Sequence, residues 1–196
     1  MDRGDLTELH FITPIANLSS IVQRGIVCNR RSREVRAVSI ALAEIQERRD
    51  RKRVPGGLLL HEYANLYVNA RNPMLSRRRD MNTSICVVQV DCSILDQEEV
   101  VISDQNAASK YARFAAAPAG LAIVSRELTF AESWLHPEDQ ILEWRHKSAM
   151  CAEVLVPDHV PSNFLCGAYV CNHAVGTQVE ALGPGIPITV NSRLFF

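Results

Sequence analysis

Residues 56–75 read GGLLLHEYANLYVNARNPML, and this stretch decides how the rest of the chain is interpreted. The glycine pair permits backbone conformations that other residues avoid, and the apolar segment 66–69 predicts a short strand. Pro73 fixes its own φ and favours extended geometry in the residue before it, which marks the end of the strand. The side chains at this end are polar. Arg71 and Asn72 offer guanidinium and amide donors at a strand end, where ligands are commonly met. An ordinary polar turn has the same composition.

The composition is that of one globular domain spanning residues 1–196. The chain is 47% hydrophobic and 22% charged, which supplies enough apolar material for a core. Its formal net charge of −1 gives no overall field that attracts nucleic acid. We find no basic, apolar leader and no run of about 18 apolar residues. We therefore expect a cytoplasmic protein that does not enter a membrane.

The six cysteines predict neither a metal site nor a disulfide framework. No two of them form a Cys-x-x-Cys pair, and none has zinc-finger spacing to a histidine. We therefore expect reduced thiols and no bound metal.

The arginines are unevenly distributed, and three clusters lie early in the chain. They are Arg30, Arg31, Arg33 and Arg36; Arg48, Arg49, Arg51, Lys52 and Arg53; and Arg77, Arg78 and Arg79. Runs of this kind are usually solvated faces. Because the three clusters flank one candidate site, a polyanionic partner explains them better than chance does.

Several short strands with helices concentrated early predict an α+β fold rather than a regular βαβ alternation. Segments 15–25 and 39–51 have helical character, with Gly25 as a natural end of the first helix. Segment 106–114 is compatible with a further helix. The expected strands are 8–12, 66–69, 83–91, 100–104, 150–157, 164–170 and 188–190.

Glu153 is the sharpest local anomaly, because it lies inside the apolar run 152–156. A carboxylate in such a strand must face solvent, pair with a cation or have a function. His10, at the start of another apolar strand, raises a similar question, and a structural histidine is one answer to it.

Segment 9–21, LHFITPIANLSSI, resembles the opening of the DarT-type DNA ADP-ribosyltransferases, which are toxins of bacterial toxin–antitoxin pairs. Further matching pieces follow in the family's order and extend the resemblance over most of residues 9–160. These pieces are IQERR at 45–49, HEY at 61–63, the segment from Tyr67 to Leu75, and AEVLVP at 152–157.

The resemblance implies an ADP-ribosyltransferase-like split β-sandwich of two small sheets with flanking helices, and NAD held in the cleft as co-substrate. By that similarity the NAD-binding residues are His10, Thr13, Asn17, Tyr67 and Arg48, with Tyr67 stacking near the nicotinamide. Glu153 matches the catalytic carboxylate, and Arg48 is the best match for the essential arginine. Arg49 and Arg51 remain possible, because the basic run leaves the register ambiguous.

The chemistry gives these residue types a physical reason. Cleavage of the nicotinamide–ribose bond builds positive, oxocarbenium-like character on the sugar, which a carboxylate such as Glu153 stabilises. An arginine can bind a pyrophosphate in a bidentate manner that a lysine cannot reproduce.

The family resemblance also guides the choice of acceptor. Many arginine-modifying relatives carry Glu or Gln two residues before the catalytic glutamate, whereas this chain has Cys151, so a protein arginine is a poor acceptor. Asn106 stands where some family members carry a histidine and modify thymidine, while others modify guanosine. It could read a base edge, or bind its own backbone. We expect guanine or thymine in single-stranded DNA, with a slight preference for guanine.

The expected DNA contacts are Asn106, Arg71, Asn72, Trp134, Arg77 and Arg78. Trp134 and Trp144 belong to segment 125–150, where an indole ring could stack on an unpaired base. Both tryptophans could instead be core anchors. The resemblance also implies a cognate antitoxin that reverses the modification or binds the toxin. A non-catalytic nucleic-acid-binding module and an RNA-directed transferase of the same fold remain as alternatives.

Overall fold

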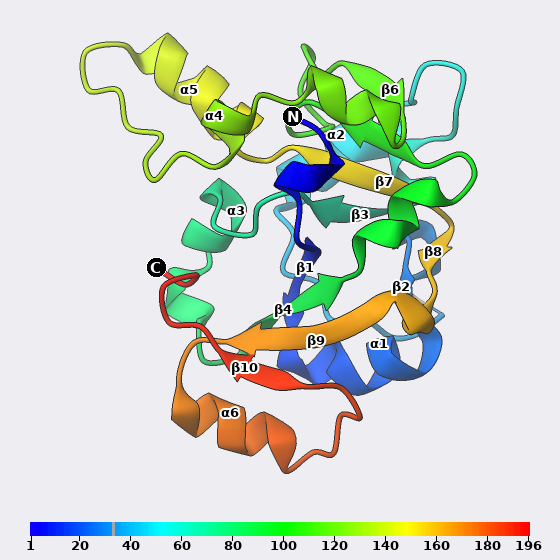
Figure 1. The fold of residues 1–196 in the computed structure, drawn as a ribbon, viewed down its shortest axis with the longest axis vertical. Coiled ribbons are helices and arrows are strands. Elements are labelled where there is room, and N and C mark those ends of the chain that lie inside the picture. Colours follow the sequence, from blue (N-terminus) through cyan, green and yellow to red (C-terminus); the bar gives the residue numbers. More distant parts are fainter. Residues whose placement is uncertain (33) are drawn as a thin grey trace.

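The structure is a computed structural model that describes residues 1–32 and 34–196, so Arg33 of the first arginine cluster lies outside it. The described residues form a mixed fold of strands and short helices (Figure 1). The strands are β1 (Leu9–Pro14), β2 (Ile26–Val27), β3 (Tyr63–Tyr67), β4 (Ile85–Val90), β5 (Val101–Ser103), β6 (Phe114–Ala116), β7 (Glu153–Pro157), β8 (His159–Val160), β9 (Leu165–Val170) and β10 (Ile188–Val190). The helices are α1 (Leu18–Arg24), α2 (Ala43–Arg51), α3 (Pro73–Ser76), α4 (Arg126–Thr129), α5 (Gln140–Ala149) and α6 (His173–Glu180).

The main sheet has the strand order β10-β9-β4-β1-β3-β7-β5-β6, and β2 and β8 form a small second sheet. Within the main sheet, β1 pairs with β4 along its whole length and β3 pairs with β7 along its whole length. By contrast, β1 meets β3 at one residue pair, His10 opposite Tyr67. The sheet therefore consists of two four-stranded halves that separate beyond this junction. The predicted α+β class and split arrangement are confirmed, with the two halves joined into one sheet.

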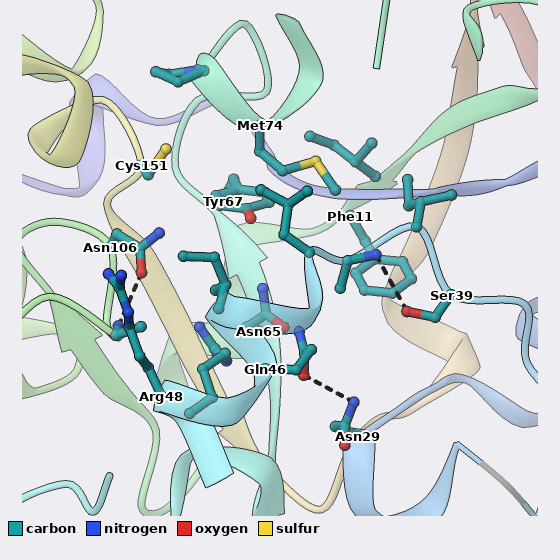
Figure 2. Close-up of a pocket in the computed structure, with 18 of the residues that line it drawn as sticks. Phe11, Asn29, Ser39, Gln46, Arg48, Asn65, Tyr67, Met74, Asn106 and Cys151 are labelled. Carbon is teal, nitrogen blue, oxygen red and sulfur yellow. Dashed lines mark hydrogen bonds between the residues drawn. The ribbon is translucent and has the colours of Figure 1, made fainter. Parts of the chain in front are cut away.

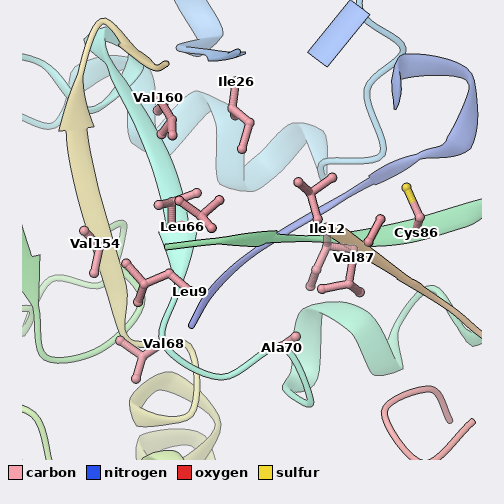
Figure 3. Packing of buried hydrophobic residues seen from close by; sticks show 14 of the residues in the cluster. Leu9, Ile12, Ile26, Leu66, Val68, Ala70, Cys86, Val87, Val154 and Val160 are labelled. Carbon is pink, nitrogen blue, oxygen red and sulfur yellow. The ribbon is translucent and has the colours of Figure 1, made fainter. Parts of the chain in front are cut away.

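The core lies on the central strands of both halves. Leu9, Leu66, Val87 and Val154 come from β1, β3, β4 and β7, and all four side chains are fully buried (Figure 3). Each such aliphatic side chain contributes about 1.5–3 kcal/mol relative to an exposed one. Five of the six residues of β4 are buried, as its continuous apolar sequence predicts.

Two predicted helices differ from the structure. Segment 106–114 forms turns, because the Asn106 side chain accepts a hydrogen bond from the Ala108 amide and the Ala107 amide is directed to Glu153 instead of a helix carbonyl. The helix predicted from residue 39 begins at Ala43, because side chains from elsewhere in the chain hold residues 38–40 outside it.

Segment 125–149 forms a lobe that projects from the sheet (Figure 1). Its two helices, α4 and α5, pack against each other. The Asp139 side chain accepts a hydrogen bond from the Leu142 amide and so caps α5, which accounts for a helix in a polar stretch that has no clear pattern. Among the described residues, no helix is long and apolar enough to cross a membrane.

Gly25 and Gly183 provide a matched test of local packing, because both have positive φ, +80° and +61°. A Cβ on Gly25 would lie 2.1 Å from the Val160 carbonyl oxygen of β8, whereas a Cβ on Gly183 would meet nothing within 4 Å. The left-handed conformation costs a non-glycine residue about 1–2 kcal/mol, and backbone overlap adds about 1–3 kcal/mol. We expect Gly25→Ala to lower the free energy of unfolding clearly more than Gly183→Ala in urea titrations. Equal losses would contradict the tight contact between α1 and β8.

Candidate active site

Glu153 begins β7 and is fully buried, with Tyr67 of β3 and Ser103 of β5 as its cross-strand neighbours. Its two carboxylate oxygens lie 3.2 and 3.0 Å from Nη1 of Arg49. The Ala107 backbone amide donates a hydrogen bond to Oε1 at 2.9 Å. Of the possibilities for this carboxylate, exposure to solvent is excluded and pairing with a cation is observed.

The arginine that pairs with Glu153 is Arg49, one of the three candidates in the basic run, while the role of Arg48 as the essential arginine stays a prediction. Consecutive residues of a helix point about 100° apart, so only one of the two can face the sheet. Arg49 is 6% exposed and reaches the carboxylate, whereas Arg48 is exposed on the rim of a cleft. The run of basic residues in α2 concealed this register, because every position in it carries a plausible side chain.

Arg49 also lines a cleft of about 1840 Å³. Figure 2 shows this cleft with Phe11, Arg48 and Tyr67 among its lining residues. Small-molecule pockets usually measure about 300–1,000 Å³, so this cleft has room for a second reactant. Its lining includes Thr13 and Phe11 from β1, Tyr67 from β3, and both Arg48 and Arg49 from α2. The two halves of the sheet therefore both contribute to it.

Tyr67 and Cys151 are neutral groups in this cleft. Burial, and then the nearby Glu153 carboxylate, raise the pKa of Tyr67 well above its ordinary value, so its phenol keeps its proton. Burial raises the pKa of Cys151 to about 12, so this thiol is not poised as a nucleophile. The predicted placement of Tyr67 in the cleft agrees with the structure.

His10 is directed to a polar cluster and does not line the cleft, and its contact with NAD stays a prediction. Its Nε2 lies 3.0 Å from Oε1 of Glu8, and Oε2 of the same carboxylate accepts a hydrogen bond from Gln89. Burial alone would raise the pKa of Glu8, but hydrogen bonds from His10, Gln89 and Tyr169 lower it to about 2.

Phe11 is a cleft residue that was not singled out from the sequence. Ile12, Thr13 and Pro14 of β1 also line the cleft, whereas His10 does not. The lining on this strand is a continuous run, which the two-residue period of a strand does not predict.

Asn17 and Arg78 line the cleft, but both are engaged in holding its wall, residues 35–42, in place. The Asn17 amide nitrogen donates to the Val38 carbonyl at 2.8 Å, and its oxygen accepts from the Val38 amide at 2.9 Å. Arg78 donates from Nε to the Ile40 carbonyl at 2.8 Å. These two residues therefore hold the wall segment in position.

Asn72 and Arg71, which the sequence predicted as DNA contacts, are bonded to backbone groups of the protein itself. Asn72 is fully buried, and its side-chain oxygen caps α3 by accepting from the amides of Met74 and Leu75. The Arg71 guanidinium donates to carbonyl groups of the segment 193–195 and lies 4.1 Å above the ring of Phe196. The side chains of Asn72 and Arg71 thus form hydrogen bonds with backbone carbonyl or amide groups that would otherwise lack partners.

Of the two tryptophans, Trp144 lines the cleft and Trp134 does not. The Trp134 ring packs 5.7 Å from the ring of Phe196, away from the cleft lining. Trp144 is 58% exposed and lines the cleft. It shares one face of α5 with Ile141, Arg145 and Ser148, at the spacing expected of one helical face.

Other polar side chains at the rim come from different elements. Arg77 is exposed, and Tyr111 is 83% exposed on the turn after β5. Asn106 also lines the cleft, as predicted, with its side-chain oxygen bonded to the Ala108 amide at 2.9 Å. Tyr111 was not singled out from the sequence, because nothing local distinguishes an exposed turn tyrosine.

Two described members of the first arginine cluster, Arg30 and Arg31, form ion pairs at the surface. Arg30 bonds Glu62 at 2.6 Å, and Arg31 bonds Asp158 at 2.6 Å. Exposed pairs contribute about 0–1 kcal/mol and leave the side chains able to exchange partners. Arg36 lines the cleft. Within residues 1–32 and 34–196, no group of three or more His, Cys, Asp or Glu side chains could hold a metal ion.

Comparison with known proteins identifies relatives over nearly the whole chain. A family model described as "DarT: ssDNA thymidine ADP-ribosyltransferase, DarT" matches residues 10–196. A DNA ADP-ribosyl transferase–DNA ADP-ribosyl glycohydrolase fusion protein from Thermosipho africanus (strain H17ap60334) is 27% identical over 203 residues, which cover 96% of this chain and 49% of the relative. The chain spans about half or less of the length of the curated relatives that it matches.

Two solved structures have the same fold. Thermus sp. 2.9 DarT in complex with ADP-ribosylated ssDNA has a TM-score of 0.82 and 22% identity, covering 100% of this chain and 99% of that chain. The complex of the same Thermus protein with NAD+ has a TM-score of 0.78 and 19% identity, covering 97% and 98%.

The buried pair leads to a prediction about stability. Arg49→Ala leaves the Glu153 charge buried without its partner, and breaking such a pair costs about 3–5 kcal/mol. Arg48→Ala removes an exposed side chain, and we expect a change within about 0.5 kcal/mol. Urea unfolding of both variants measures the difference. Replacing Glu153 by Gln in the Arg49→Ala background should recover part of the loss, and equal effects of the two arginine variants would contradict the pairing.

Proposed function

This chain belongs to the DarT family, described as ssDNA thymidine ADP-ribosyltransferases, and from that premise we propose that it transfers one ADP-ribose from NAD to a base in single-stranded DNA. The observation that carries the proposal is the buried carboxylate of Glu153, held by Arg49 beside a cleft large enough for two reactants. The complexes of the Thermus protein with NAD+ and with ADP-ribosylated ssDNA support the same choice of reactants.

In the proposed reaction, NAD binds in the cleft beside Thr13, Phe11 and Tyr67. The bond between the ribose carbon and nicotinamide breaks, and nicotinamide leaves with the bonding electron pair as a neutral molecule. A base nitrogen then supplies the electron pair for the new bond and releases its proton. The neutral Tyr67 phenol, whose pKa is raised by burial and by Glu153, offers a stacking surface without adding charge.

Glu153 is the proposed catalytic carboxylate. Positive charge develops on the ribose as nicotinamide leaves, and a buried carboxylate stabilises that charge far more than water does. Arg49 contacts Glu153 at 3.0 Å and so offsets the cost of placing a carboxylate at 0% exposure. Arg48, exposed on the rim, is our candidate for the pyrophosphate contact, because a guanidinium matches two phosphate oxygens.

The acceptor strand is proposed to cross the rim formed by α5 and the turn after β5. Trp144 and Tyr111 are exposed aromatic rings at this rim, and Arg145 and Arg77 are cations beside the same cleft. Aromatic rings with interspersed cations are the usual means of binding unpaired bases. A duplex would hide its base edges and require extrusion of a nucleotide, which favours single strands.

We propose thymine as the modified base, with guanine as the alternative to be tested. The description of the family names thymidine, whereas Asn106 gave the sequence a slight preference for guanine. One oxygen lone pair of Asn106 is engaged by the Ala108 amide, so its remaining amide donor is the group proposed to meet a base edge. An oxygen acceptor on the base fits this donor, and both bases have one.

A toxin role and a cognate antitoxin complete the proposal. The Thermosipho relative joins a DNA ADP-ribosyl transferase to a DNA ADP-ribosyl glycohydrolase in one chain. We propose that this chain acts in the bacterial cytoplasm with a partner that removes the modification or binds the transferase.

Incubation with NAD and single-stranded oligonucleotides, read by mass spectrometry, tests the activity and the base. One DNA set contains thymine without guanine and a second contains guanine without thymine, while duplex and RNA versions serve as controls. We expect one added ADP-ribose on the thymine set. Glu153→Gln should lower transfer by about 100-fold or more, with NAD affinity changed by less than about fivefold, because the carboxylate acts in the transition state.

Several outcomes would contradict this proposal. DNA binding without any mass change would indicate a nucleic-acid-binding module, and modification confined to RNA would indicate a different transferase. Transfer above about a tenth of wild type in Glu153→Gln would exclude the glutamate as the catalytic group.

The two tryptophans make a matched pair for testing the acceptor rim. Stacking on an aromatic ring contributes about 1–3 kcal/mol per base, so we expect Trp144→Ala to lower oligonucleotide modification at least about tenfold at limiting DNA. Trp134→Ala should change it by less than about twofold, because Trp134 packs on Phe196 outside the cleft. NAD affinity, measured by calorimetry, should be unchanged in both. If Trp134→Ala lowers modification more than Trp144→Ala does, the acceptor site lies on the other side of the lobe.

A further inference from the structure

The turn segment between β5 and β6, residues 104–113, is fastened to the rest of the site at several points. Its ends are joined by Arg113, whose backbone and Nε donate to the Asp104 carboxylate at 2.9 and 2.7 Å. The backbone amide of Asn106 donates a hydrogen bond to the Ser148 carbonyl of α5 at 2.9 Å. The Ala107 amide donates to Glu153 at 2.9 Å. This segment therefore touches both the catalytic carboxylate and the proposed DNA-binding helix.

Lys52 provides a further attachment, from the opposite side of the cleft. It directly follows α2, and its amino group donates a hydrogen bond to the Ser109 carbonyl. The same amino group lies 5.1 Å from the centre of the Phe114 ring, at the far end of the 104–113 segment. Lys52 is half-buried and lines the cleft. Burial lowers its pKa, an effect that the nearby Glu153 charge opposes.

Helix α2 is thus connected to the 104–113 segment by two routes. One route runs from Arg49 through Glu153 to the Ala107 amide, and the other runs from Lys52 to the Ser109 carbonyl. The first route is broken or rearranged whenever Glu153 engages a substrate. The second does not involve the carboxylate, so it can persist through the reaction.

We propose that Lys52 is a positioning residue that holds the 104–113 segment against α2 during the reaction and so determines whether the ribose carbon is captured by a DNA base or by water. This inference rests on the proposed function. Asn106 and Tyr111, which lie on the segment, belong to the rim assigned to the acceptor. A loosened segment would place the base poorly and admit solvent, and both changes favour hydrolysis.

The two outcomes share their first event and differ in the nucleophile. In both, the bond from the ribose carbon to nicotinamide breaks and nicotinamide keeps the electron pair. In transfer, a base nitrogen forms the new bond and loses its proton to solvent. In hydrolysis, a water oxygen forms the new bond and loses a proton, giving free ADP-ribose. The ratio of DNA modification to nicotinamide release therefore measures the partition directly.

The test compares Lys52→Met, Lys52→Arg and Arg53→Met with the wild type at saturating NAD and oligonucleotide. Nicotinamide release and DNA modification are measured in the same reactions. Arg53→Met is the matched control, because Arg53 is adjacent and cationic but its guanidinium donates to the Gly57 carbonyl on the exposed surface. We expect Lys52→Met to lower the transferred fraction about tenfold, with KM for NAD within about threefold of wild type.

Lys52→Arg retains a donor for the Ser109 carbonyl and should restore most of the transferred fraction. Arg53→Met should keep the wild-type fraction. If Lys52→Met does not fold, Lys52→Gln replaces it with the same expectation. A wild-type ratio in folded Lys52→Met or Lys52→Gln, or an equal change in Arg53→Met, would overturn the role of Lys52 while the proposed function stands. A wild type that releases nicotinamide without modifying any oligonucleotide would overturn the proposed function itself.

Discussion

The buried ion pair between Arg49 and Glu153 is the constraint on which the site depends. The two residues are 104 positions apart in the chain, and the carboxylate has no exposed surface. A charge in that environment requires a partner, so α2 has to dock at the start of β7, and the Ala107 amide has to turn inwards to complete the hydrogen bonding. One side chain thereby gathers a helix, a strand and a turn around the same point.

The division of the main sheet gives this pair its cleft. Because β1 and β3 meet at His10 and Tyr67 alone, the strands diverge on either side of that junction and leave space for a ligand. Tyr67 is also the cross-strand neighbour of Glu153. The junction of the two halves therefore lies directly beside the carboxylate, and residues from both halves can act on one substrate.

Many polar side chains near the cleft serve the backbone. Asn17 and Arg78 hold the wall 35–42, and Arg71 and Asn72 do the same for the C-terminal segment and α3. Irregular segments have amide and carbonyl groups without secondary-structure partners, and burying them requires such donors and acceptors. A polar residue beside a ligand site is thus often part of the structure that holds the site in place, as these four side chains are.

The sequence alone determined the fold class, the buried strands and the anomalous position of Glu153, because these depend on local patterns: apolar runs, punctuation by glycine and proline, and a carboxylate where apolar residues are expected. Only the tertiary structure decided that Arg49 rather than Arg48 contacts Glu153, and that Trp144 rather than Trp134 lines the cleft. Two residues of the same type in one segment have equal local propensities. Their roles differ because a docked helix points their side chains in different directions. The way the helix docks is set by contacts between distant parts of the chain.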